Sequence, residues 1–224
     1  MKRNEKPTKL IDSLYNNRKG VEIMPKTFFT SDPHINHDKD FVWKARGFNS
    51  IEEHNAAIIK NWNETVGPDD EVHIVGDIMV GTDQDSALEL LSKLNGKIYI
   101  TRGNHDSDSK VQKYLNLPNF DSENTSLETY SRMIRIGKWR FYLCHWATRL
   151  GDFNHAKSSD RRICLHGHTH SKDKFQFIDD CCYNVAMDAH NNRPVSVEEI
   201  QNDIREYLQK KNSEQMKMKN ASDN

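Results

Sequence analysis

Five short polar motifs in this sequence hold side chains that are suited to binding metal ions. Each motif follows a short apolar run, at the point where a strand would give way to a loop. Carboxylate oxygens, amide oxygens and imidazole nitrogens are common ligands of divalent metals. The candidate ligands, in chain order, are Asp32, His34, Asp77, Asn104, His145, His168 and His170. Together they predict a site for two metal ions.

The spacing of these residues indicates how they would share two ions. Asp32 and His34 are two residues apart, so in an extended backbone both side chains would point the same way. His168 and His170 repeat that spacing and can serve one metal each. Asp77 has two carboxylate oxygens and can bridge both ions. Two ions about 3.5–4 Å apart would hold a phosphate group and acidify a bridging water into a nucleophile.

Four further residues are candidates for contacts with a substrate. His105 lies next to Asn104 but would be free to protonate a leaving oxygen, with Asp106 as its orienting partner. His37 could approach the phosphate, and an ordinary loop histidine is the alternative. Arg46 could neutralise a phosphate oxygen, with a solvated surface arginine as the alternative. These four residues complete the predicted site.

The elements expected to position these residues alternate between strands and helices in the first half of the chain. Helices are predicted after a capping box at Ser50, over residues 84–95, and after a second capping box at Ser196. The later half is richer in strands, which favours two sheets packed face to face with helices outside. In such sheets ligands bind beyond the carboxyl ends of the strands, where the motifs lie. The apolar runs that predict strands are residues 27–30, 72–75, 97–101, 140–144, 163–165, 175–178 and 183–187.

Length and charge indicate one domain with polar ends. The chain has 224 residues, and its mean hydropathy of −0.87 is low for an enzyme. We expect a polar N-terminal extension at residues 1–24, one domain over residues 25–208 and a disordered polar tail at residues 209–224. The net charge of −1 supplies no global positive field for a long nucleic acid, so the sequence gives no strong signal for nucleic-acid binding.

The cysteines and the lack of long apolar stretches bear on the compartment. No stretch reaches about 18 apolar residues and the N-terminus shows no signal-peptide pattern, so we expect no membrane association. The cysteines have no secretory context and no zinc-ribbon spacing. They are Cys144, Cys164, Cys181 and Cys182. The sequence therefore predicts a cytoplasmic protein with reduced thiols.

The motif set resembles the calcineurin-like metallophosphoesterase superfamily, and within it the small bacterial and phage phosphoesterases. The motifs read Asp32-Pro33-His34, Gly76-Asp77, Gly103-Asn104-His105-Asp106, His145 and Gly167-His168-Thr169-His170. The resemblance spans about residues 26–205 and implies a four-layer α/β/β/α sandwich with a dinuclear metal site at the C-terminal ends of the strands. It also implies that His105 is the general acid. The implied ligands are Asp32, His34, Asp77 and His170 for the first metal, and Asp77, Asn104, His145 and His168 for the second.

The residues and the resemblance together predict a metal-dependent phosphoester hydrolase. The favoured substrate is a phosphodiester, either a nucleotide or another small molecule. The alternatives are a phosphomonoesterase, a nuclease and a non-catalytic protein-binding scaffold. The intact ligand set counts against the scaffold, and the balanced charge counts against the nuclease. Mixed oxygen and nitrogen ligands suit Mn²⁺, which we favour, and also Fe, Ni²⁺ or Zn²⁺.

Overall fold

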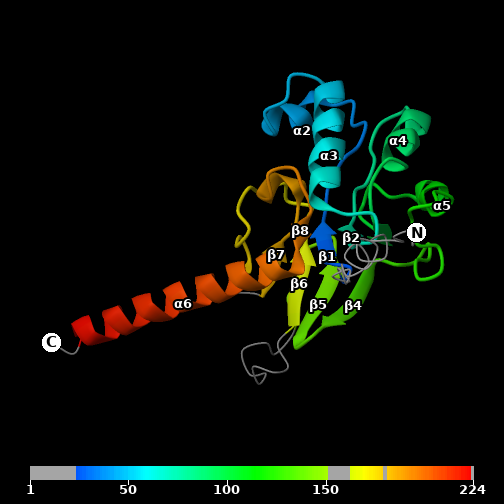
Figure 1. The fold of residues 1–224 in the computed structure, drawn as a ribbon. Coiled ribbons are helices and arrows are strands. Elements are labelled where there is room, and N and C mark those ends of the chain that lie inside the picture. The colour runs from blue at the N-terminus through cyan, green and yellow to red at the C-terminus, as the bar shows by residue number, and fades with distance from the viewer. Residues whose placement is uncertain (1–23, 151–161, 179–180, 223–224) are drawn as a thin grey trace, which may run out of the picture.

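Two four-stranded sheets form the centre of the protein (Figure 1). The computed structural model describes residues 24–150, 162–178 and 181–222. The first sheet has the order β3-β2-β1-β8, and the second has the order β4-β5-β6-β7. The strands of the first sheet are β1 (Thr27–Thr30), β2 (Glu71–Val75), β3 (Lys97–Thr101) and β8 (Val195–Ser196). Those of the second are β4 (Ser131–Ile136), β5 (Trp139–Cys144), β6 (Arg162–His166) and β7 (Cys182–Asn184).

The parallel strands of each sheet lie next to one another. In the first sheet β1, β2 and β3 are parallel, and β8 pairs with β1 in the antiparallel direction. In the second sheet β5, β6 and β7 are parallel, and β4 forms an antiparallel hairpin with β5. Parallel neighbours end at the same edge of a sheet, so the loops that follow these strands are brought together.

Helices cover the outer face of the first sheet (Figure 1). Ile58 and Trp62 of α3 (Ile51–Thr65) and Leu91 of α4 (Gln84–Leu91) are completely buried. They pack in one core with strand residues such as Ile74 and Ile98. Side chains alternate along a strand, so Phe28 of β1 faces these helices. The helices are α2 (Asp40–Ala45), α3 (Ile51–Thr65), α4 (Gln84–Leu91) and α5 (Asp108–Leu115), with a 3-10 turn, η3 (Met187–Ala189), later in the chain.

A second core lies between the two sheets. Phe29 of β1, Phe141 of β5 and Leu165 of β6 are completely buried in it. The last helix, α6 (Val197–Ser222), adds Ile200 and Ile204 to the same core. These two cores confirm the predicted α/β fold with packed sheets.

Helix α6 is longer than the sequence predicts. Its predicted capping box is present, because the Ser196 hydroxyl accepts a hydrogen bond from the Glu199 N–H and the Glu199 carboxylate accepts one from the Ser196 N–H. The helix then continues to Ser222 and extends away from the sheets (Figure 1), so the prediction of a disordered tail is wrong for residues 209–222. The tail lacks apolar periodicity, but it also lacks glycine and proline, and its lysines, glutamines and methionines propagate a helix that its packed first half has nucleated. In the described part of the chain, no helix is long and apolar enough to cross a membrane.

Two other predicted elements differ in the structure. Helix α4 ends at Leu91 rather than near residue 95. Residues 175–178 form a turn instead of a strand, in which the Ile178 N–H donates to the Phe175 carbonyl. The apolar residues of this turn resemble a strand in the sequence because they pack against two different clusters. Phe175 and Ile178 join the core between the sheets, where Phe175 stacks on Tyr207 of α6, and Phe177 packs against the cysteines. Helices α2 and α5 were not predicted.

The lowered pKa of His73, a buried histidine in β2, leads to a prediction about stability in acid. The His73 ring stacks between Phe29 and Tyr99, with ring centres 5.4 and 4.8 Å away. Burial, aided by the charge of Arg132, lowers the pKa of His73 to about 3. Below about pH 6.5 His73 therefore binds a proton in the unfolded chain but stays neutral in the folded protein. As the pH falls further, the free energy of unfolding decreases by about 1.4 kcal/mol per pH unit.

Replacing this imidazole with a phenyl ring should remove that part of the acid sensitivity. When the pH falls from 7 to 5, we expect the free energy of unfolding of His73→Phe to decrease by about 2 kcal/mol less than that of the wild type. Urea unfolding of both proteins at the two pH values measures the difference. An equal loss in both proteins would contradict a neutral, buried His73.

Candidate metal centre

All seven predicted metal ligands follow the carboxyl ends of parallel strands. Asp32 and His34 follow β1, Asp77 follows β2, Asn104 follows β3, His145 follows β5, and His168 and His170 follow β6. The two sheets are joined at this edge, because the Ser31 N–H donates to the Val185 carbonyl and the Met187 N–H donates to the Ser31 carbonyl. The fold therefore brings five separate segments together at one place.

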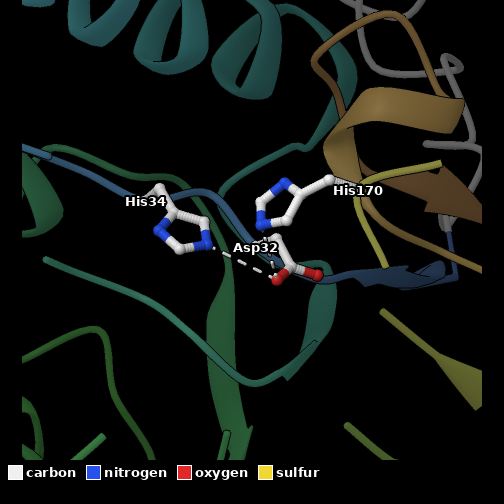
Figure 2. Close-up of side chains that lie close together, drawn as sticks. All are labelled: Asp32, His34 and His170. Carbon is white, nitrogen blue, oxygen red and sulfur yellow. Dashed lines mark ion pairs between the residues drawn. The ribbon is translucent and has the colours of Figure 1, made fainter. Parts of the chain in front are cut away.

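The first cluster contains Asp32, His34 and His170. One ligand atom from each lies within 4.8 Å of the others. The Nε2 atoms of His34 and His170 lie 3.5 and 3.7 Å from Asp32 Oδ1, and Figure 2 shows both imidazoles directed toward that carboxylate. Asp32 and His34 are buried, and the His170 side chain is 35% exposed.

The second cluster contains Asp77, His145 and His168, again with ligand atoms within 4.8 Å of one another. His145 Nε2 lies 3.2 Å from Asp77 Oδ2 and 3.3 Å from His168 Nδ1. The predicted amide ligand is also here, because Asn104 Oδ1 lies 3.1 Å from His145 Nε2. His168 and His170 thus fall in different clusters, as their spacing predicts.

Asp77 lies between the two clusters. Its Oδ2 atom is 3.2 Å from His145 in the second cluster and 3.9 Å from His34 in the first. Its Oδ1 atom accepts a hydrogen bond of 2.8 Å from the His105 N–H. This position suits a carboxylate that bridges two ions.

The hydrogen bonding of the first cluster tests whether these residues fit a metal ion. Asp32 Oδ1 and His34 Nε2 are both buried, and neither has a hydrogen-bond partner among the described residues. Buried polar atoms without partners are rare and costly, and a cation between them would satisfy both. The carboxylates, imidazoles and amide of the two clusters are also the ligand types that divalent transition metals take. The residues therefore fit two such ions.

The clusters also perturb the pKa values of their members. Burial alone would raise the pKa of Asp32, but the nearby imidazoles of His34 and His145 hold that pKa far below its usual range. Burial alone would lower the pKa of His145, but its hydrogen bond with Asp77 and the charges of Asp32 and Asp77 raise that pKa to about 9. Both carboxylates are thus held in the ionised form that metal binding requires.

The backbone of the ligand loops adopts an unusual conformation. Five ligands have positive φ angles, in the left-handed region that costs residues other than glycine about 1–3 kcal/mol each. They are Asp32 (56°), His34 (48°), Asp77 (56°), His168 (68°) and His170 (51°). The expectation that Asp32 and His34 converge because their backbone is extended is therefore wrong. They converge because the surrounding structure holds both in the left-handed region.

Gly76 and Gly103 allow the loops to approach the ligands. A Cβ on Gly76, which has φ +91°, would lie 2.5 Å from His145 Nδ1 and 2.7 Å from Gly103 Cα. A Cβ on Gly103 would overlap the Asp77 carboxylate. Both glycines of the predicted motifs are thus required by close packing around the centre.

Asp106 supports these loops instead of orienting His105. Its buried carboxylate accepts hydrogen bonds of 2.8, 3.1 and 2.9 Å from the N–H groups of Asp77, Ile78 and Gly103. None of the hydrogen bonds between described residues joins it to the His105 side chain. The prediction of a catalytic role for Asp106 is corrected accordingly, because three backbone donors, those of Asp77 and Ile78 far away along the chain, occupy its carboxylate.

Arg46 also differs from both sequence interpretations. Its side chain is only 1% exposed, so it is neither a surface residue nor open to a substrate. Its guanidinium forms a paired contact with Asp188, at 2.7 and 3.1 Å, and donates to the Asp32 carbonyl. Asp188 in turn lies 3.1 Å from His170 Nδ1, on the side of the ring away from the cluster. Arg46 and Asp188 therefore hold the first cluster in place.

Asp188 is a site residue that the sequence analysis did not predict. Its signal was weak, since it is a single acidic residue in a turn with no metal-ligand spacing. Its hydrogen bond overcomes the effect of burial and raises the pKa of His170. Such a partner fixes the orientation of a ligating imidazole and makes it a better donor.

His105 and His37 flank the centre. The His105 side chain is 45% exposed, and its Nε2 atom lies 4.0 Å from Asp77 Oδ2. His105 and Asn104 also line a cavity of about 410 Å³. His37 is buried, and its ring stacks on His34 with 5.1 Å between ring centres. His105 is therefore the more open of the two toward solvent.

Comparisons with known proteins agree with this geometry. A model of the calcineurin-like phosphoesterase family matches residues 25–217. An uncharacterized protein of Methanocaldococcus jannaschii is 32% identical over 182 residues, which cover 79% of this chain and 90% of that protein. The gene 66 protein of Mycobacterium phage L5 is 31% identical over 172 residues, which cover 66% of this chain and 79% of the phage protein.

A solved structure supports the fold. The crystal structure of a protein of unknown function from Aquifex aeolicus superposes with a TM-score of 0.59 and covers 80% of this chain and 98% of its own. The two sequences are 18% identical, so the similarity is one of fold. The family match over residues 25–217 and the 32% identity to the archaeal protein show that the chain belongs to the calcineurin-like phosphoesterase family.

Proposed function

We propose that this protein is a metal-dependent phosphodiesterase that acts on a nucleotide or another small phosphodiester. The observation that carries the proposal is the pair of carboxylate–imidazole clusters that meet at Asp77, beside the exposed His105. We further propose two divalent transition-metal ions as cofactors, with Mn²⁺ favoured over Fe, Ni²⁺ and Zn²⁺. The domain would span residues 25–208, to which α6 adds a helical extension.

The residues present divide naturally between two ions. Asp32, His34 and His170 would hold one ion, His145, His168 and Asn104 would hold the other, and Asp77 would contact both. When bound, such ions neutralise phosphate oxygens and lower the pKa of water toward neutrality. Because the ligands are buried or fixed by hydrogen bonds, the protein holds this arrangement before a substrate arrives.

We further propose that His105 donates a proton to the leaving oxygen. Its Nε2 atom is 4.0 Å from Asp77 Oδ2, so it can reach an oxygen of a phosphate held at the centre. Its backbone N–H is tied to Asp77, while its side chain remains 45% exposed and lines the cavity. The departing group can therefore leave into that cavity. We also propose that His37, whose ring stacks on the His34 ring, contacts the phosphate beside the first cluster.

The charge around the first cluster favours a diester over a monoester. A phosphomonoester carries nearly two negative charges at neutral pH, and a diester carries one. Arg46 was the predicted partner for additional phosphate charge, but it is buried and paired with Asp188. A substrate with a single negative charge therefore fits this side of the centre better.

Purified protein loaded with Mn²⁺ tests the proposed function. We expect it to hydrolyse bis-p-nitrophenyl phosphate faster than p-nitrophenyl phosphate, to lose activity in EDTA and to recover it with Mn²⁺. A panel of 2′,3′- and 3′,5′-cyclic nucleotides then tests nucleotide substrates. Faster cleavage of the monoester would overturn the diester preference, and no hydrolysis of any ester between about pH 5 and 9 would favour a non-catalytic scaffold.

The bridging position of Asp77 can be tested by metal content. Asp77→Asn should hold well under two ions per chain, because a neutral amide cannot balance two dications. Asp121→Asn is a matched control, since Asp121 is also a buried carboxylate but belongs to neither cluster. Mass spectrometry of metals measures the ratio. Two retained ions with normal turnover in Asp77→Asn would exclude the bridge.

The role of His105 can be tested with leaving groups of different pKa. His105→Ala should keep both ions and lose about 10²–10⁴-fold in kcat, the usual contribution of one general acid. The loss should be smaller for p-nitrophenolate, which leaves without protonation, than for an alkoxide. If good and poor leaving groups suffer equally, His105 positions the phosphate instead.

A further inference from the structure

A cavity with two aromatic walls lies next to the metal centre. It has a volume of about 410 Å³, and Asn104 and His105 form the side that faces the second cluster. Tyr130 and Trp146 also line it, and they are 47% and 38% exposed. This volume lies within the range of small-molecule sites, about 300–1,000 Å³. The cavity is thus continuous with the site of the proposed reaction.

Trp146 is fixed against the second cluster. It follows the ligand His145, and its ring lies edge-on to the His145 ring with 5.3 Å between centres. The His168 ring is 6.1 Å away. Two ligand imidazoles therefore support the indole while it remains partly open to the cavity, so little of its freedom would be lost on binding a ligand.

Tyr130 is supported by an arginine that is itself held in place. The Arg102 guanidinium lies 4.7 Å from the centre of the Tyr130 ring. Arg102 is 5% exposed, donates two hydrogen bonds to the Asp106 carbonyl and pairs with Asp108 at 2.7 Å. The arginine is thus committed to protein partners, and the phenol ring it supports is presented to the cavity.

The remaining lining is polar. His105, Ser107 and Lys110 offer hydrogen-bonding groups beside the two rings. The Lys110 ammonium is fixed by the carbonyls of Met79 and His105, both at 2.9 Å. Aromatic surfaces with a few polar groups match a planar ligand whose edge carries hydrogen-bonding atoms, and they fit a purely apolar ligand poorly.

We infer that this cavity binds the nucleobase of a nucleotide substrate, with the base stacked on Trp146 and Tyr130 while its phosphate lies at the metal centre. The inference rests on the proposed function and narrows its substrate class to nucleotides. Every nucleobase has a π-face, so stacking on these rings tolerates different bases. The base lies on the side lined by His105, which places the nucleoside on the leaving-group side of the phosphate.

Two ligands that differ only in the base test this inference. Isothermal titration of the Mn²⁺-loaded protein with adenosine 5′-monophosphate and with ribose 5-phosphate measures binding without catalysis. We expect the nucleotide to bind about tenfold or more tightly, as one stacked base provides. Trp146→Ala should reduce nucleotide binding to the level of ribose 5-phosphate and leave ribose 5-phosphate binding unchanged, whereas Trp146→Phe should retain most of the difference.

Phe41 supplies the matched control. It is 66% exposed and lies at the first cluster's side of the centre, 5.4 Å from the His37 ring. Phe41→Leu should leave the affinity for both ligands unchanged, and a selective loss of nucleotide binding in that variant would place the base on the wrong side for our inference. Equal binding of the two ligands to the wild type would also overturn it, as would an equal loss of both in Trp146→Ala.

The same protein preparation separates this inference from the proposed function. Hydrolysis of bis-p-nitrophenyl phosphate combined with equal binding of the two ligands would overturn the base site and leave the phosphodiesterase intact. Base-dependent binding that Trp146→Ala abolishes, without hydrolysis of any ester, would support the base site and overturn the enzyme.

Discussion

Two buried carboxylates, Asp32 and Asp77, must stay ionised although both lie close to the same imidazole, that of His34, and much of the structure around them serves that requirement. They are 0% and 2% exposed, and the charge of Asp32 acts to raise the pKa of Asp77. Ionised groups are costly to bury unless they are paired or bind a metal. Backbone N–H groups of His168 and His105 donate to the two carboxylates. The neighbouring imidazoles then complete a pocket of ligands whose negative charge metal ions would balance.

This requirement explains why strain collects in the loops. Five of the predicted ligands adopt left-handed backbone conformations, which lets their side chains point inward from the ends of three strands, β1, β2 and β6. That strain persists only where the surroundings determine the loops closely. Asp106 does so for the loops around Asp77 and Gly103, and the buried Arg46–Asp188 pair does so for Asp32 and His170. These two buried groups therefore support the loops that carry the predicted ligands.

The residues that gather in the two clusters could be predicted from the sequence, because each occurs in a short motif directly after an apolar run. The sequence also predicted the sheets, since β1, β2 and β3 were visible as such runs. The roles of Arg46 and Asp106 were wrong for a common reason, namely that their partners lie far away along the chain, Asp188 being 142 residues from Arg46. The tail after residue 208 was wrong for another reason, because hydrophobic periodicity reports packing and a solvated helix shows none.

The centre and the adjacent cavity use different physical interactions, and this separates reactivity from selectivity. In the proposed function the clusters would recognise a phosphate by charge, which any phosphoester supplies, so they would not by themselves choose a substrate. Tyr130 and Trp146 would instead recognise shape and aromatic character, and their rings are in contact with Arg102 and His145 respectively. Because Trp146 touches His145 while it faces the cavity, a ligand stacked there would be aligned with the second cluster. Selectivity would then arise from how well the bound group lets its phosphate reach both clusters, rather than from the strength of phosphate binding.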